Sequence, residues 1–203
     1  MRWPGARLSS PTGAGTRSLP GVLTISTRWP KAIQPRRDGC LEAAAAIDVD
    51  EWLSRRAAGE PEYYVAEHGE WPEVDPTSEF TGPMDILSGQ PLAEVAILLV
   101  PTTESWQVPC LLGWGDWNEC PAPAEHSAIL KRWRERYGTE LVTMTHDVIE
   151  LAVERPVLTR EDALGLSREQ FVYCPDIVHQ GTETIEGLAA ALLNGTVWFF
   201  WWD

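Results

Sequence analysis

The sequence predicts an α+β fold, a single compact C-terminal domain whose helices pack on a mixed or antiparallel sheet. Two long segments after residue 120 show helical periodicity, and β-rich runs lie between them and at the end of the chain. The 11 tryptophans and an apolar share of 44% supply a core, since a domain of roughly 150 residues hides about 70% of its unfolded surface. We therefore expect one globular core over residues 93–203.

Residues 1–38 differ from the rest in composition. They mix Arg, Pro, Gly, Ser and Thr without periodicity. They hold seven of the 16 basic residues and only one acidic residue, Asp38. Such a segment cannot bury enough surface to order itself. We predict a disordered basic tail or a mis-assigned start, with a basic arm that touches membrane or nucleic acid as the alternative.

The remainder is strongly acidic, with 9 basic and 29 acidic residues. Its charge repels phosphate backbones and attracts cationic surfaces, so we expect no nucleic-acid partner and favour a basic one. No stretch approaches the roughly 20 apolar residues that cross a bilayer, so we expect no membrane partner. The four cysteines match neither a disulfide scaffold nor a paired zinc motif. They are interpreted as reduced thiols in the cytoplasm.

Residues 39–92 form a helix followed by a proline-rich connecting region. The segment from Cys40 to Arg56 is rich in alanine and other helix formers. From Gly59 to Pro91, repeated prolines break any periodicity, so this part is expected to wrap the core or vary freely.

The domain is expected to begin with a strand and a glycine-rich loop. The aliphatic run from Val95 to Val100 predicts a strand covered on both faces, with Trp106 to Leu112 as its hairpin partner. The loop from Gly113 to Pro121 contains indoles that must pack on something.

A helix follows and ends at Tyr137, because prolines suit its first turn and Gly138 suits a left-handed cap. Its apolar face opposes four cations: Lys131, Arg132, Arg134 and Arg136. We interpret these cations as a solvated face paired with the protein's own carboxylates, and an anion-binding face is the alternative.

The last third alternates strands and helices. Two β-rich runs, 140–145 and 148–153, are joined by His146 and Asp147 as a hairpin. A capping box at Thr159 predicts a helix to about Cys174, and a shorter helix ends at Asn194. The aromatic run 196–203 predicts a strand buried on both sides and not at an edge.

Candidate chemistry gathers after the capped helix, where Cys174, Asp176 and His179 lie within six residues. These residue types suit Cys–His catalysis, with His126 or Glu169 as helpers. The simpler interpretation has Asp176 and Gln180 bonding the loop backbone while Cys174 packs as a small hydrophobe. A zinc site that joins Cys120 and His126 to Cys174 and His179 is a further alternative, which no spacing selects.

Four ordered motifs carry a family resemblance. They are Leu112-Gly-Trp-Gly-Asp-Trp-Asn-Glu-Cys-Pro121, Trp133 to Gly138, Tyr173-Cys-Pro-Asp-Ile-Val178 with Gln180-Gly181, and Trp198 to Asp203. Over roughly Val95 to Asp203, the chain resembles the bacterial domain-of-unknown-function family 4253. Family patterns more often have Gly at Asp116 and Tyr at Phe171. The resemblance implies a bacterial cytosolic protein, and it supplies no catalytic residues.

We expect a non-enzymatic module that binds a protein or a small ligand, without cofactor or metal, in a toxin-immunity or regulatory role. The alternative is a small enzyme using Cys174, Asp176 and His179. The tryptophan-rich loop and the loop from Cys174 to Gly181 are expected to form one binding surface. Its candidate residues are Trp114, Trp117, Asn118, Glu169, Cys174, Asp176, His179, Gln180, Trp201, Trp202 and Asp203.

Overall fold

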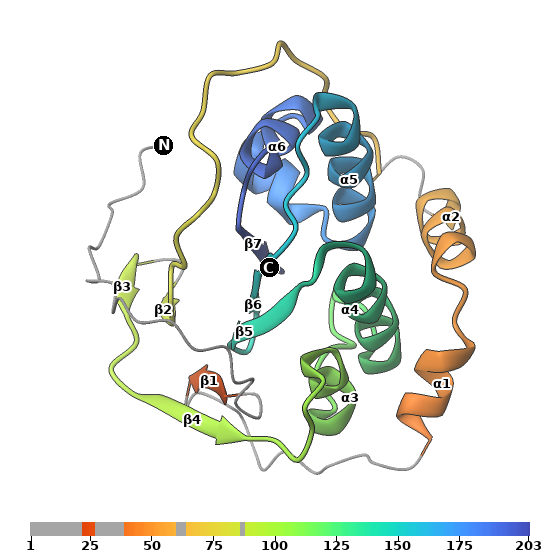
Figure 1. The fold of residues 1–203 in the computed structure, drawn as a ribbon, viewed down its shortest axis with the longest axis vertical. Coiled ribbons are helices and arrows are strands. Elements are labelled where there is room, and N and C mark those ends of the chain that lie inside the picture. The colour runs from red at the N-terminus through yellow and green to blue at the C-terminus, as the bar shows by residue number, and fades with distance from the viewer. Residues whose placement is uncertain (1–21, 27–38, 60–63, 86–87) are drawn as a thin grey trace.

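A five-stranded sheet organises the protein in the computed structural model, which describes residues 22–26, 39–59, 64–85 and 88–203 (Figure 1). The strand order is β4-β1-β5-β6-β7. The strands are β1 (Val22–Ser26), β4 (Val95–Leu99), β5 (Glu140–Met144), β6 (Val148–Ala152) and β7 (Val197–Trp201). Strand β1 runs parallel to β5 and the other neighbours are antiparallel, so the sheet is mixed. The predicted α+β class is confirmed.

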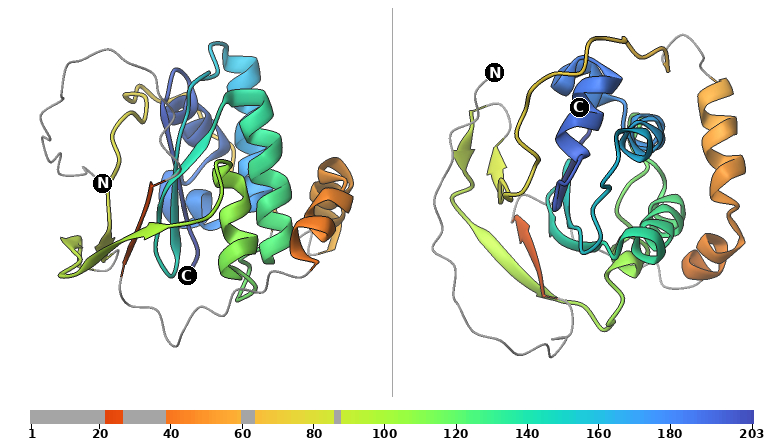
Figure 2. Two further views of the ribbon diagram at one scale, coloured as in Figure 1. Left: turned by 60° about the horizontal axis from the view of Figure 1, so that its bottom comes forward. Right: turned by 45° about the horizontal axis from the view of Figure 1, so that its top comes forward.

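Helices α3, α4 and α5 cover one face of this sheet, here called the inner face, and residues 64–83 run along the opposite, outer side (Figure 2). A small second sheet pairs β2 (Met84–Asp85) with β3 (Gln90–Pro91). The helical elements are α1 (Cys40–Ala46), α2 (Val49–Gly59), the 3-10 turn η1 (Ser105–Gln107), α3 (Val108–Leu112), α4 (Pro123–Tyr137), α5 (Arg160–Tyr173), the π-helical turn η2 (Ile177–Thr182) and α6 (Ile185–Leu192). Within the described ranges, none of these helices has the length and apolar character needed to cross a membrane.

Local signals in the sequence set the ends of the two long helices as predicted. Helix α4 starts with Pro123 and ends at Tyr137, where Gly138 follows as its cap with a φ of 65°, the left-handed conformation that glycine adopts at low cost. Helix α5 starts after Thr159, whose Oγ1 accepts a hydrogen bond of 3.1 Å from the backbone N of Asp162.

The predicted hairpin and the short last helix are also confirmed. Strands β5 and β6 pair antiparallel, and the backbone N of Thr145 donates to Val148 O across the turn at 2.8 Å. Helix α6 ends at Leu192.

Two predictions about the start of the domain are wrong. Residues 106–112 form the end of η1 and helix α3 instead of a hairpin partner, with Pro109 in the helix's first turn. Strand β4 exists, but it lies at the sheet's edge and exposes Val95, Ile97 and Leu99 by 45%, 69% and 77%. An aliphatic run gives the same pattern for a central strand and for this exposed edge.

The prediction that the last strand does not lie at an edge is also wrong, because β7 forms the edge of the sheet opposite β4. Its side chains are nevertheless mostly buried, since helices lie on one side and the outer-side segment on the other. The backbone N atoms of Thr196 and Val197 donate to Thr77 O at 2.9 and 3.1 Å, which covers the start of this edge.

The N-terminal half contributes more than a tail. Residues 22–26, inside the predicted disordered segment, form β1, while the rest of residues 1–38 lies outside the described ranges. The helix predicted over 40–56 forms as two, α1 and α2, separated at Ile47 and Asp48. Residues 64–83 have no helix or strand, as expected of a connecting region that wraps the core.

The prediction of four reduced thiols is wrong for two of them. Cys40 and Cys110 form a disulfide, 70 residues apart in sequence, and Cys120 and Cys174 are buried free thiols. Cys40 and Cys110 meet because α1 packs beside α3 and α4, a tertiary contact that spacing along the chain cannot reveal.

The four cations of α4 pair with the protein's own carboxylates. Lys131 contacts Glu135, Arg134 contacts Glu140, and Arg136 contacts Glu169 at 2.9 Å. Arg132 lies 2.7 Å from Asp50 and 3.3 Å from Glu169. This face is therefore neutralised from within, as the first interpretation expected, and the anion-binding alternative loses its free cations.

Candidate functional site

The two loops singled out by the sequence meet at the last residues of the chain. Asn118 Nδ2 donates to Asp203 O at 2.5 Å, and the backbone N of Asp203 donates to Asp176 Oδ2 at 3.1 Å. Gln180 Nε2 donates to Asp176 Oδ1 at 3.2 Å. This hydrogen-bond chain joins residues 116–119, 174–181 and 201–203 into what is called here the joined-loop surface.

The tryptophan-rich loop adopts a shape that only certain residues allow. At Gly115, with φ of 117°, a Cβ atom would lie 2.2 Å from Pro121 O and 2.8 Å from His126 Cδ2. Asp116 and Asn118 also have positive φ, at 72° and 45°, a conformation that Asp and Asn tolerate better than other residues with a Cβ. The backbone N of Asp116 bonds Pro121 O at 3.0 Å and closes the loop.

The indoles of the site divide into buried supports and half-buried contacts. Trp114 and Trp202 are each 1% exposed, and Trp114 Nε1 donates to Thr145 O at 2.8 Å. Trp117 and Trp201 are half-buried. The Trp117 ring packs edge-on against Trp114, with centroids 4.9 Å apart. The buried pair therefore fixes the loop from below and leaves Trp117 partly exposed, while Trp201 points to the other side of β7 from Phe200 and Trp202.

A buried polar chain lies under the loop. Cys120 Sγ is 3.2 Å from His126 Nε2, and His126 Nδ1 is 2.6 Å from Tyr173 Oη. Cys120 is 5% exposed, while His126 and Tyr173 are fully enclosed. A thiol, an imidazole and an orienting hydroxyl are the parts of a cysteine nucleophile.

Burial opposes the charged forms that such a nucleophile needs. It raises the pKa of the Cys120 thiol and lowers the pKa of the His126 imidazole well below its ordinary value. Both groups are therefore neutral, and the chain Cys120–His126–Tyr173 satisfies buried polar atoms without forming a thiolate–imidazolium pair.

The trio suggested by the sequence is not arranged for nucleophilic attack. Cys174 is fully buried, its thiol donates to Trp201 O at 3.0 Å, and burial raises its pKa. Asp176 accepts bonds from Asp203 and Gln180, while His179 is exposed with its ring 5.2 Å from that of Phe171. These contacts give the loop a structural role, but Asp176 bonds the Gln180 side chain and Asp203 instead of the loop backbone that the simpler interpretation expected.

Glu169 lies apart from the other candidates, in the contact between α4 and α5. Its carboxyl group accepts from Trp133 Nε1 at 2.6 Å and pairs with Arg136. Of the four proposed zinc ligands, Cys120 and His126 contact each other. No group of three or more His, Cys, Asp or Glu side chains in the described ranges is placed to hold a metal ion.

One residue of the site was missed by the sequence, namely Arg56 of α2. Its Nε donates to Val172 O at 3.0 Å, and its Nη2 contacts the backbone oxygen of Glu119 and, at 3.4 Å, the Glu119 carboxyl group. Arg56 thus ties the tryptophan-rich loop to the end of α5. A helix some 60 residues upstream gives no local signal of this contact.

Comparisons with known proteins agree with the resemblance stated above. Neither the curated proteins nor the solved structures give a significant match. A family model covers residues 96–203, more than half of the chain. The chain therefore belongs to the family described as a domain of unknown function, DUF4253.

Proposed function

We propose that this protein is a non-enzymatic recognition module that binds a basic protein through the joined-loop surface. The carrying observation is the hydrogen-bond chain from Asn118 through Asp203 to Asp176, which fixes two loops against each other before any partner arrives. Preorganised loops lose less conformational entropy on binding.

The composition of this surface supports a basic partner. Trp117 is half-buried, and tryptophan is a frequent anchor of interfaces. The exposed residues Asp116 and Asp203 add negative charge, which steers cationic proteins toward the surface. Neutralisation of a basic toxin in the bacterial cytoplasm is one concrete form of this function, and regulation of a basic protein is another.

The experiment is affinity capture from bacterial extract with the full chain as bait, followed by calorimetry with the binder that is identified. We expect a basic protein whose affinity falls at least about tenfold with Trp117→Ala. Its affinity should also fall as salt rises. Trp71→Ala is the matched control, because Trp71 is a half-buried tryptophan outside the joined-loop surface. Equal binding by the two variants, or binding unaffected by salt, would remove the proposal.

The reactivity of the two free thiols distinguishes the recognition module from the enzyme alternative, which requires a reactive cysteine. With raised pKa values, Cys120 and Cys174 should resist iodoacetamide in the folded protein near neutral pH. Peptide mass spectrometry after a timed reaction locates any adduct, and the denatured chain shows full alkylation as the control. Rapid modification of either cysteine in the folded chain would favour an enzyme.

A further inference from the structure

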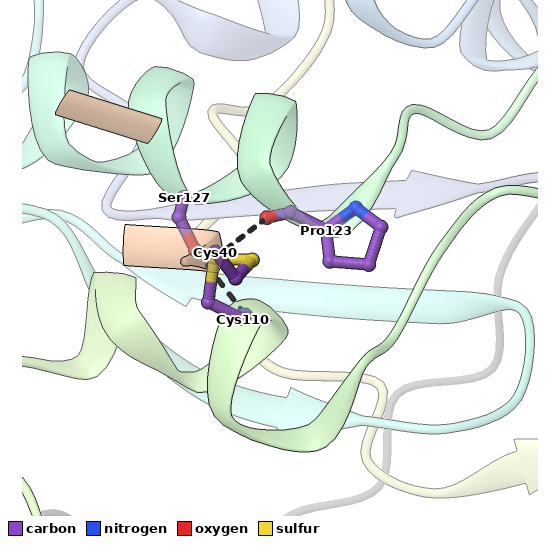
Figure 3. Close-up of a disulfide and its surroundings, with 4 residues drawn as sticks. All are labelled: Cys40, Cys110, Pro123 and Ser127. Carbon is purple, nitrogen blue, oxygen red and sulfur yellow. Dashed lines mark hydrogen bonds between the residues drawn. A yellow bond between two sulfur atoms is a disulfide. The ribbon is translucent and has the colours of Figure 1, made fainter. Parts of the chain in front are cut away.

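The disulfide attaches the N-terminal helical pair to the family domain. Cys40 begins α1, and Cys110 lies in α3, with Cα atoms 5.6 Å apart. Figure 3 shows the bond between the helices, where the backbone N of Cys110 donates to Ser127 Oγ at 3.3 Å. Cys110 is 1% exposed and Cys40 is half-buried. The Cys40 half of the disulfide, on α1, is therefore the more accessible half, and the Cys110 half is buried.

Apart from this bond, α1 is held by a small apolar cluster, in which Ala44 is buried with Ala128 of α4 while Leu41 and Ile47 pack against it. The helix has seven residues, four of them consecutive alanines, and its buried residue is Ala44. A helix this short is not stable by itself in water, and an alanine buries little apolar surface. Loss of the disulfide therefore frees α1 first.

Helix α2 follows α1 directly and carries Arg56 to the site. The guanidinium lies over the rings of Trp52 and Tyr64, 5.2 and 5.8 Å from their centroids, and reaches Val172 O and the backbone oxygen of Glu119. Glu119 belongs to the joined-loop surface, and Val172 lies just before its second loop. The position of α2 therefore decides whether the two loops are bridged from this side.

We propose that the Cys40–Cys110 disulfide is a redox-controlled staple of the joined-loop surface. When oxidised, it holds α1 and α2 so that Arg56 bridges Glu119 and Val172. When reduced, it lets α1 detach and α2 loosen, and the surface loses its preorganisation. As a means of controlling binding, this staple rests on the function proposed above. Because Trp52 stays buried at 3% exposure, α2 loosens and does not leave.

The chemistry needs an external dithiol, either a small dithiol or a thioredoxin-type protein. Its two thiols supply two electrons and two protons to the sulfur–sulfur bond, which becomes two cysteine thiols, and the dithiol closes to its own disulfide. In the cytoplasm, the compartment proposed here, disulfides are rare and usually transient, catalytic or redox-sensing. A redox-sensing bond fits that compartment better than a permanent one.

The test is hydrogen exchange of the full chain, oxidised and then treated with dithiothreitol, and it needs no partner. We expect peptides over 113–121 and 172–181 to exchange about tenfold faster after reduction, with β5 and β6 unchanged. In Cys40→Ser, the hydrogen exchange of those peptides should be fast before any treatment and should not change with dithiothreitol. Arg56→Gln should make the same peptides fast while the disulfide remains.

Each contrary result overturns the staple. Alkylation without reductant in denaturant, followed by peptide mass spectrometry, that finds free thiols at Cys40 and Cys110 in the air-oxidised protein removes its basis. Unchanged exchange after reduction, faster exchange throughout the domain, or no effect of Arg56→Gln also refutes it. If a partner is known, its affinity should fall together with the loop protection. Absence of any partner would count against the proposed function and leave the exchange result standing.

Discussion

The two faces of the sheet are covered by different chemistry. On the inner face, Trp133 of α4 stacks on Phe200 with centroids 5.3 Å apart and lies edge-on to Trp198 and Tyr173. On the outer face, between Thr143 and Phe199 in the register, stands the fully buried Glu150. One face is closed by aromatic packing and the other is closed around a carboxyl group.

Glu150 is held by the segment that wraps this side. The backbone N of Thr81 donates to Glu150 Oε1 at 2.6 Å, Thr81 Oγ1 donates to the same atom at 2.7 Å, and the backbone N of Gly82 donates to Oε2 at 3.2 Å. A buried carboxyl group is tolerated when its oxygens are bonded in this way. The inner contacts lie within the family region, whereas the outer cover comes from residues before it.

The largest effect should come from the inner face. Trp133 is fully buried and packs against three aromatic rings, and Trp133→Ala removes both this packing and the bond to Glu169. We expect a loss of about 3–5 kcal/mol in the free energy of unfolding, the usual range for a buried large aromatic. Urea denaturation followed by circular dichroism measures it. Leu158→Ala, at a side chain 71% exposed, should change stability by less than about 0.5 kcal/mol.

A smaller and more local effect is expected on the outer face. Glu150→Gln keeps the shape but turns one acceptor into a donor that faces the N–H and O–H groups of Thr81 and Gly82. We expect a loss of about 1–3 kcal/mol, together with faster hydrogen exchange in residues 77–82. Glu161→Gln, on the exposed start of α5, is the control. If both variants behave alike, the carboxyl group does not hold the segment.

The comparison also explains what the sequence could predict. Helix α4, helix α5 and the β5–β6 hairpin depend on local signals, such as the left-handed Gly138 and the cap at Thr159, and all three were predicted. The exposure of β4, the edge position of β7 and the Cys40–Cys110 pair depend on which segments meet in space. The local sequence pattern is the same whether a strand lies at the centre or at the edge of a sheet and whether two cysteines meet or stay apart, so these three features could not be predicted.

The candidate site follows the same division. Both loops were identified from their residue types, but Asp176 and Gln180 were expected to bond the loop backbone and instead bond each other's side chains. The bridge by Arg56 and the chain from Cys120 through His126 to Tyr173 join residues that lie six to more than a hundred positions apart. Such contacts come from the packing of α2, α4 and α5 and have no sequence motif.

The smallest expected effect is a pH dependence of the outer cover. Glu186 of α6 anchors the wrapping segment, because its Oε1 lies 2.9 Å from His68 Nδ1 and its Oε2 accepts from the backbone N of Gly69 at 2.9 Å. The bond to His68, followed by the bond to Gly69, lowers the pKa of Glu186 from its ordinary 4.5 to about 2.

A carboxyl group with a lowered pKa stabilises the fold above its ordinary pKa, and that stabilisation is lost as the pH falls toward the lowered value. The difference in unfolding free energy between the wild type and Glu186→Gln should therefore be present at about pH 5 and shrink as the pH falls from 4.5 to 2. Urea denaturation at a series of pH values measures it. A difference for Glu186→Gln that stays constant down to pH 2 would show that the tether to His68 and Gly69 contributes nothing through ionisation, and it would leave Glu150 as the main polar anchor of the outer face.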